Sequence, residues 1–169
     1  MFADDLIAAS TRLLATCRAA RLHVAVAESC TGGLVSGVLT EIAGSSDVFD
    51  RGFVTYSNEA KRDLLGVPGD LLADFGAVSA QVARAMAEGV LTYSAADISV
   101  AITGVAGPGG GTPLKPVGHV HFAAARRGHP TIHELHEFGD PGRGRIRLLA
   151  VGVAPGLLPR QADRGWLPG

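Results

Sequence analysis

Three side chains with the chemistry to cleave an amide stand just after two apolar segments of the chain. Ser29 lies in the run 27–33 (AESCTGG), and Tyr56 and Lys61 lie in the run 56–61 (YSNEAK). A serine hydroxyl is a weak nucleophile at neutral pH unless a neighbouring base removes its proton. None of the six histidines lies in a comparable turn. Lys61 is therefore the candidate base, and Tyr56 is a hydroxyl that could relay or orient the proton.

A lysine acts as a base only when its amine is uncharged, and the sequence suggests how that state arises. With Asn58 as a helix N-cap, Lys61 falls in the first helical turn, where the positive end of the helix dipole disfavours an ammonium. Burial lowers the pKa further from its ordinary value of about 10.4. Two alternatives stay open: Lys61 is a solvated surface lysine, and Ser29 or Thr31 merely caps a helix.

Glycine-rich turns near these residues offer backbone N–H groups to a substrate. Gly32 and Gly33 let a ligand approach the backbone, and we expect free N–H groups around Thr31–Gly33 to receive an oxyanion. The run 103–113 (TGVAGPGGGTP) follows another apolar segment, and Lys115 comes soon after it. Successive N–H groups in such turns bind anions. The run lacks the spacing of dinucleotide- and phosphate-binding loops, and a flexible linker is the alternative.

The spacing of apolar residues places these runs in an alternating pattern of strands and helices. The expected helices cover 3–20, 31–43, 59–65, 79–93 and a segment from 142 onward; the expected strands cover 23–27, 51–56, 97–103, 118–125 and 131–138, with a short turn at 70–74. This order predicts an α/β protein, a single three-layer α/β/α domain with a mixed β-sheet. We expect the domain to span 1–159, with a flexible tail at 160–169. Pro155 should break the last helix.

Composition and charge exclude several classes of function. The net charge is −1 at neutral pH, so the charge balance does not indicate a positive electrostatic field that would attract nucleic acid. Cys17 and Cys30 form neither a metal motif nor a disulfide framework, which favours a reducing compartment. The longest uncharged run is broken by glycines and a proline, so we expect no membrane span. Together with an acidic N-terminus, these features predict a cytoplasmic protein.

The histidines raise the question of a metal site. His119 and His121 share one face of an expected strand, but His133 and His136 fall on opposite faces of the next. The run His-Glu-Leu-His is also not the helical zinc signature. We therefore expect no metal site.

Six blocks of sequence, in order along nearly the whole chain, resemble the C-terminal domain of the CinA family (competence/damage-inducible protein), which includes nicotinamide-nucleotide amidases. The matching blocks are AESCTGG at 27–33, YSNEAK at 56–61, GAVS at 76–79, TGVAGPGG at 103–110, KPVG at 115–118 and FGD at 138–140. The resemblance implies a hydrolase without metal or cofactor. Its substrate would be a small-molecule nucleotide, nicotinamide mononucleotide, which it converts to nicotinic acid mononucleotide and ammonia in pyridine nucleotide salvage. Family members also commonly self-associate, which implies a homo-oligomer.

The resemblance also implies roles for individual residues. Ser29 would be the nucleophile, Lys61 the general base and Tyr56 an assisting hydroxyl. A larger set would surround the substrate: Thr31, Gly32 and Gly33 at the oxyanion, Thr103, Gly104, Gly107, Gly109, Gly110 and Lys115 along the glycine-rich run, and Arg143 and Arg147 at the phosphate.

Two rival readings remain. Cys30 is intrinsically more reactive than serine once it is ionised, but no histidine stands near it in sequence to activate it, and a small buried residue is the alternative. The second rival is a catalytically inactive module that binds a nucleotide or a protein and is linked to competence or DNA damage. The presence of both Ser29 and Lys61 argues against such a module, because binding alone requires neither.

Overall fold

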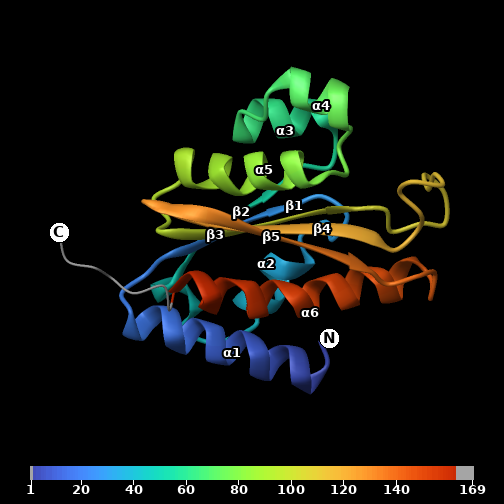
Figure 1. The fold of residues 1–169 in the computed structure, drawn as a ribbon. Helices are drawn as coiled ribbons and strands as arrows, with labels where there is room; N and C mark the ends of the chain where they lie inside the picture. Colours follow the sequence, from blue (N-terminus) through green and yellow to red (C-terminus); the bar gives the residue numbers. More distant parts are fainter. Residues whose placement is uncertain (1, 163–169) are drawn as a thin grey trace.

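The computed structural model describes residues 2–162, which form an α/β fold around a five-stranded mixed sheet (Figure 1). The strands lie in the order β2-β1-β3-β4-β5. β1 runs parallel to both β2 and β3, whereas β4 is antiparallel to β3 and β5 is antiparallel to β4. Their bounds are β1 Val24–Glu28, β2 Phe49–Val54, β3 Ile98–Gly104, β4 His119–Arg126 and β5 His129–Glu137.

Helices cover both faces of this sheet (Figure 1). One face carries α1, α2 and α6, and the other carries α5 with α3 and α4 outside it. The bounds are α1 Asp4–Ala19, α2 Leu34–Thr40, α3 Asn58–Leu65, α4 Gly69–Phe75, α5 Ala80–Thr92 and α6 Arg143–Ala162, with a short 3-10 helix at Ser45–Asp47. The expected three-layer domain with a mixed sheet is therefore the observed architecture.

The side chains of the central strands divide the interior into two cores. Val24 and Val26 of β1 pack with α1, α2 and α6, whereas Ala25 and Ala27 pack under α5. All five residues of β1 are buried, because both faces of the strand are covered. Small alanines on the α5 side leave room for that helix to lie close to the sheet.

Four strands begin or finish at the same end of the sheet, and this end positions the candidate site. Because β1 and β3 are parallel, Ser29 and the glycine-rich loop after Gly104 both follow the carboxyl end of a strand at this end of the sheet. β2 is parallel to them and leads to Tyr56. The antiparallel strand β4 begins at the same end of the sheet, since Val120 pairs with Gly104. Open α/β sheets bind ligands outside the carboxyl ends of their strands.

Two expected elements differ in the structure. The helix expected over 31–43 covers only Leu34–Thr40, because Gly32 and Gly33 take positive φ angles of 60° and 96° that hold the preceding turn out of helical geometry. The segment 70–74, expected as a turn, belongs to α4.

The expectation that Pro155 breaks the last helix is wrong. α6 continues through Pro155 and Pro159 to Ala162. A proline inside a helix costs about 3 kcal/mol, but α6 buries side chains along its whole length, including Leu157 and Leu158. Arg126 also donates to the carbonyls of Gln161 and Ala162 at the end of the helix.

The flexible tail expected at 160–169 falls partly inside the described residues. Residues 160–162 belong to α6, and 163–169 lie outside the described part of the chain. Between residues 2 and 162, no helix combines the length and apolar character needed to cross a membrane.

Candidate active site

Ser29 and Lys61, which are 32 positions apart in the sequence, lie within hydrogen-bonding distance of each other. Lys61 Nζ is 3.1 Å from Ser29 Oγ and donates to the carbonyl oxygen of Thr55 at 2.8 Å. Ser29 stands directly after β1, and Lys61 projects from α3. The structure thus brings together the nucleophile and base expected from the sequence.

The environment of Lys61 favours its uncharged form. Its side chain is only 1% exposed, and this burial lowers its pKa from 10.5, with a smaller opposing effect of Cys30. The N-cap of α3 is Ser57 rather than Asn58, since Ser57 Oγ accepts from Ala60 N at 3.0 Å. Lys61 is therefore the fourth residue of the helix. Burial is the larger cause of its altered chemistry, because the dipole effect weakens within the first turn.

Glu28 fixes the turn that carries Ser29, and the sequence reasoning did not identify this role. Its carboxylate is fully buried and accepts four hydrogen bonds, from the backbone N–H groups of Gly33 (3.0 Å), Val35 (3.0 Å) and Ser36 (2.8 Å) and from Ser36 Oγ (2.7 Å). It thereby satisfies the N–H groups at the start of α2. The available signal was a lone acidic residue at the end of an otherwise apolar strand.

Arg147 holds the carbonyl groups of the same turn. Its Nε donates to Cys30 O at 3.1 Å and its Nη2 donates to Thr31 O at 2.9 Å. The resemblance assigned Arg147 to the phosphate, but these two donors are already engaged with the backbone. Its geometry is that of a residue that positions the turn behind Ser29.

Only two N–H groups of this turn remain available to an oxyanion. The N–H groups of Gly32 and Gly33 were expected to be free, but Gly32 N donates to Ser29 O and Gly33 N donates to the Glu28 carboxylate. Within the segment 29–36, the N–H group of Thr31 has no hydrogen-bond partner, and the N–H group of Cys30 contacts only its own sulfur. They follow the nucleophile directly, which is where a developing oxyanion needs donors.

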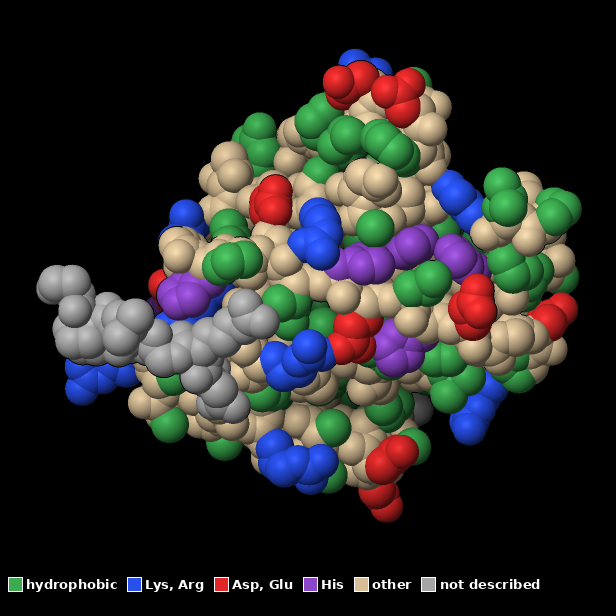
Figure 2. Space-filling model, in the orientation of Figure 1, with side chains coloured by type: hydrophobic (Ala, Val, Ile, Leu, Met, Phe, Trp, Pro, Cys, Tyr) green, Lys and Arg blue, Asp and Glu red, His purple; other side chains and the backbone are tan. Residues whose placement is uncertain are grey.

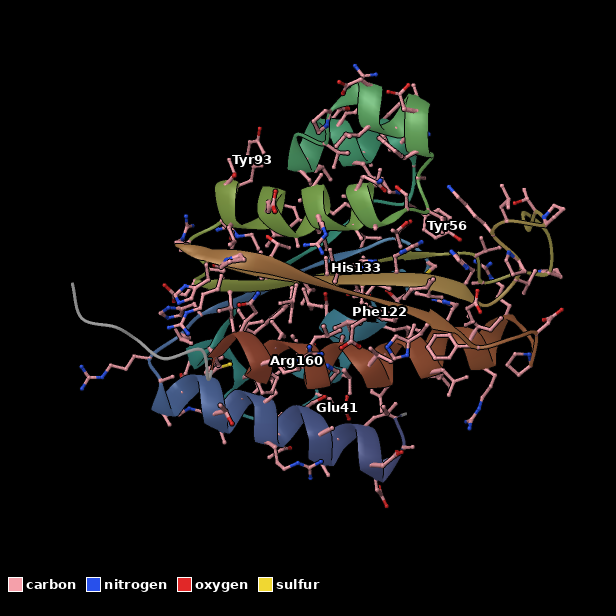
Figure 3. The ribbon with its side chains drawn as sticks, viewed as in Figure 1. Glu41, Tyr56, Tyr93, Phe122, His133 and Arg160 are labelled. Atoms are coloured by element: carbon pink, nitrogen blue, oxygen red, sulfur yellow. The ribbon has the colours of Figure 1, made fainter. Side chains whose placement is uncertain are left out.

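Tyr56 lies on the surface, near the loop that follows β3 (Figure 3). It is 59% exposed, and its hydroxyl accepts from Arg143 Nη2 at 2.6 Å. Arg143 Nη1 donates to Gly107 O at 2.8 Å. Arg143 thus links Tyr56 to the glycine-rich loop, and the structure records no hydrogen bond from Tyr56 to either Ser29 or Lys61.

The remaining candidates lie along β3 and the loop that follows it. Thr103 is buried and its Oγ1 donates to Ala77 O at 2.8 Å. Gly104 packs so close to Val120 that a Cβ would lie 2.6 Å from its side chain, whereas Gly109 and Gly110 have open space around them. Lys115 Nζ donates to Phe75 O at 2.5 Å.

Cys30 is a poor rival to Ser29. Burial raises the pKa of its thiol to about 11, so the thiol is protonated at neutral pH and is a weak nucleophile. Two nearby hydroxyls, Thr31 Oγ1 and Thr55 Oγ1, are buried without a hydrogen-bond partner. Such groups usually bind a water molecule or a ligand.

Three histidines form a hydrogen-bonded chain on the α5 side of the sheet. His119 Nε2 is 3.1 Å from His121 Nε2, His121 Nδ1 is 2.9 Å from His133 Nε2, and His119 Nδ1 is 3.3 Å from Glu137 Oε1. Figure 2 shows histidine side chains in a row on this face. Burial lowers the pKa of His121 to about 4. Within residues 2–162, no three His, Cys, Asp or Glu side chains are arranged to hold a metal ion.

The chain matches one family model and several proteins of known structure. The model of the CinA C-terminal domain matches residues 7–161. A CinA-like protein of Citrifermentans bemidjiense is 45% identical over 95% of this chain and 38% of that protein. A CinA-like protein of Synechococcus sp. is 52% identical over 94% of this chain and 38% of that protein. The chain therefore spans 38% of the length of these curated relatives.

Solved structures agree with this match. The competence/damage inducible protein CihA of Agrobacterium tumefaciens superposes with a TM-score of 0.93 at 51% identity, over 95% of this chain and 97% of that chain. A competence-damaged protein (CinA) superfamily member from Klebsiella pneumoniae superposes with a TM-score of 0.89 at 34% identity, over 95% of this chain and 99% of that chain.

Proposed function

Because the chain belongs to the CinA C-terminal domain family, we propose that it is a nicotinamide-nucleotide amidase of the cytoplasm. In this proposal it hydrolyses nicotinamide mononucleotide to nicotinic acid mononucleotide and ammonia, without a metal or cofactor, in pyridine nucleotide salvage. The observation that carries the proposal is the 3.1 Å approach of the buried Lys61 amine to the Ser29 hydroxyl. A nucleophile and an adjacent base are the minimum that acyl transfer requires.

The first half of the proposed reaction forms an acyl-enzyme. Uncharged Lys61 takes the Ser29 proton as Ser29 Oγ bonds to the carboxamide carbon of the substrate. The N–H groups of Cys30 and Thr31 receive the oxyanion, and each such donor contributes about 3 kcal/mol in enzymes where this has been measured. When the C–N bond breaks, Lys61 returns the proton to the departing nitrogen, which leaves as ammonia.

The second half releases the acid. A water molecule attacks the acyl carbon while Lys61 takes its proton, and the ester bond to Ser29 breaks. The proton returns to Ser29 Oγ, so the enzyme regains its starting state. The carbonyl oxygen of Thr55, 2.8 Å from Lys61 Nζ, holds the amine in place through both halves.

Arg143 is the proposed phosphate residue. It stands at the exposed rim between Tyr56 and Gly107, and a guanidinium pairs well with a phosphate. Arg147 is assigned instead to positioning the Ser29 turn. Tyr56 assists through Arg143 at this rim, and a substrate that displaces it from Arg143 would free its hydroxyl.

The test is ammonia release from nicotinamide mononucleotide by the purified chain, with Ser29→Ala as the key variant. We expect Ser29→Ala to bind the nucleotide in calorimetry and to release no ammonia. Ser46→Ala, which alters an exposed serine, is the matched control and should keep wild-type turnover. Wild-type turnover by Ser29→Ala would contradict the nucleophile assignment. Binding without turnover by the wild-type chain would favour an inactive nucleotide-binding module.

A further inference from the structure

The row of three histidines on the α5 side of the sheet takes no part in the proposed reaction. His119 and His121 belong to β4, where residues two apart face the same side of the strand. His133 belongs to β5 and lies on the same side of the sheet (Figure 3). His119 and His121 are only 7% and 8% exposed. Nearly buried polar side chains that contact one another in this way have a structural or a binding role.

The hydrogen bonds of the row decide which ring nitrogens carry protons. Three imidazoles in contact cannot all be charged, because like charges repel, and a neutral imidazole carries one N–H. The Glu137 carboxylate only accepts, so His119 carries its proton on Nδ1. His119 Nε2 is then a lone pair, 3.1 Å from His121 Nε2. His121 can donate to it from Nε2, in which case His133 Nε2 donates to His121 Nδ1 at 2.9 Å.

A second arrangement of the same protons keeps the outer contacts. When His121 carries its proton on Nδ1, it donates to His133 Nε2, and His133 carries its proton on Nδ1. The contact between His119 and Glu137 is unchanged. The Nε2 atoms of His119 and His121 then both present lone pairs, which is favourable only with a cation between them. Both arrangements hold three protons, so a metal ion can enter without any net loss of protons.

The spacing of the two nitrogens fits a shared metal ion. Imidazole nitrogens bind Zn²⁺ at about 2.0–2.1 Å. Two nitrogens at that distance from one ion and 3.1 Å from each other subtend about 100° at the ion, between the angles of square-planar and tetrahedral coordination. The His119 and His121 rings are not stacked, since their planes meet at 74° with centroids 4.9 Å apart. Both nitrogens can therefore point to one position.

The partners of the outer nitrogens are those that metal-binding histidines require. A histidine that binds a metal through one nitrogen usually donates the other N–H to a carboxylate or another acceptor, which fixes the ring. His119 Nδ1 has Glu137 Oε1 at 3.3 Å, and His121 Nδ1 has His133 Nε2 at 2.9 Å. Both rings are thus held in the orientation that a metal ion needs.

We propose that His119 Nε2 and His121 Nε2 together bind one divalent transition-metal ion that accepts imidazole ligands, Zn²⁺, Ni²⁺ or Cu²⁺, with water completing its coordination. Such a site has two protein ligands, so it is not one of the groups of three or more that residues 2–162 lack. The expectation of no metal site rested on the opposite faces of His133 and His136. Neither of these is a ligand in this site.

The charges near the pair determine which ions bind. Glu137 is the anion at one end of the row, whereas Lys115 acts on His121 as a positive charge. Ions that prefer several carboxylate oxygens, such as Mg²⁺, are therefore excluded. The site also lies apart from the proposed reaction, because β3 separates β4 from the strand that leads to Ser29. Metal binding therefore does not depend on the proposed amidase activity.

The first test is calorimetric titration of the full chain with Zn²⁺ at neutral pH, in a buffer that does not bind metals. The wild-type chain should bind one Zn²⁺ and no Mg²⁺, and His119→Ala should bind Zn²⁺ more than about 100-fold more weakly. His23→Ala, at an exposed histidine, is the matched control and should keep the wild-type affinity. A wild-type chain that binds no Zn²⁺, or equal affinity in His119→Ala, overturns the proposal.

A surface variant removes the question of folding. The Glu137 side chain is 67% exposed, so Glu137→Ala leaves the core intact and removes only the acceptor of His119 Nδ1. Loss of such an acceptor weakens metal binding by about 10-fold or more, and we expect this loss in the same titration. Unchanged affinity in Glu137→Ala would contradict the assignment of His119 Nε2 as a ligand.

Nuclear magnetic resonance of the ¹⁵N-labelled chain tests the position of the ion. Zn²⁺ should move the His121 proton from Nε2 to Nδ1 and the His133 proton from Nε2 to Nδ1, while His119 keeps its proton on Nδ1. His136, which contacts Glu134, is the internal control and should not change. Zn²⁺ that binds while His121 keeps its proton on Nε2 is held elsewhere, and that result overturns the proposal.

Discussion

Two turns leave the ends of neighbouring parallel strands, and they are held in opposite ways. In the turn after β1, Glu28 takes three backbone N–H groups and Arg147 takes two backbone C=O groups. In the loop after β3, a Cβ added at Gly109 or Gly110 would touch nothing within 4 Å. The turn that carries Ser29 is fixed on both sides, whereas the glycine-rich loop has open space at Gly109 and Gly110.

The only two lysines of the chain repeat this contrast. Lys61 is 1% exposed and contacts Ser29, whereas Lys115 stands in the loop and donates to Phe75 O. In the proposed function, the bond-forming groups therefore lie on the fixed turn, and the proposed substrate contacts lie on the glycine-rich loop. Precise positioning is needed where bonds form, because small displacements there cost a large part of the rate.

The largest expected effect is the loss of activity when Lys61 is replaced. Lys61→Arg keeps a positive charge and hydrogen-bond donors, but arginine does not deprotonate in proteins, so it cannot take the Ser29 proton. Ammonia release should fall by about 10³-fold or more. Arg62→Met, at an exposed cation of the same helix, should retain activity. Substantial turnover by Lys61→Arg would show that position 61 supplies charge rather than a base.

The pH dependence of the rate gives the next effect. Only the uncharged Lys61 accepts a proton, so turnover should rise about tenfold per pH unit below its pKa and level off above it. Because burial lowers this pKa from 10.5, the plateau should begin below pH 10.5. The rising limb should persist in Cys30→Ala. Its disappearance there would assign the titration to the thiol.

Replacing Glu28 tests the fixed turn. Glu28→Gln keeps the shape of the side chain but turns an amide NH₂ group toward backbone N–H donors, which leaves buried groups unpaired. The expected loss is about 2 kcal/mol in the free energy of unfolding, measured by urea denaturation, together with a lower kcat. Glu41→Gln, at an exposed position after α2, is the control. Unchanged stability in Glu28→Gln would mean that its four hydrogen bonds do not hold the turn.

The smallest effects compare one glycine from each turn. Gly33 has a φ of 96°, so Gly33→Ala should cost about 1–2 kcal/mol of stability through backbone strain. Gly109→Ala meets nothing within 4 Å and should change stability by no more than about 0.5 kcal/mol. Thermal unfolding of the two variants measures the difference. A larger loss in Gly109→Ala than in Gly33→Ala would reverse the contrast between the turns.

Most of the fold was predictable because it follows from local patterns. Apart from the shortened α2 and the helix α4 at a predicted turn, the strands and helices between Asp4 and Thr92 lie close to their expected positions, as do the hairpin strands β4 and β5. The prediction failed at Pro155, where the local tendency of proline to break a helix competes with tertiary packing. The burial of α6 against the sheet and α1 outweighs the cost of the interrupted helix. Sequence patterns contain no term for such burial.

The candidate site divides in the same way. Ser29 and Lys61 were recognisable because a hydroxyl and an amine each follow a strand, and Arg143 because it follows the Gly-Asp pair. The contacts of Arg147 with the Ser29 turn and the role of Glu28 were not foreseen, because both depend on contacts between segments distant in the chain or folded back on it. The N–H groups of the Ser29 turn that remain free could be identified only once the acceptors of the other N–H groups, Ser29 O and the Glu28 carboxylate, were known.

The amino-acid sequence by itself determined which residue types occupy the ends of the strands, and hence the class of chemistry available there. Only the tertiary structure decided which of them act together. Burial lowers the pKa of Lys61, two charged side chains fix the turn beside it, and the strand order leaves β5 at an open edge. Each of these depends on desolvation or on contacts across the fold, which arise only when distant segments pack together.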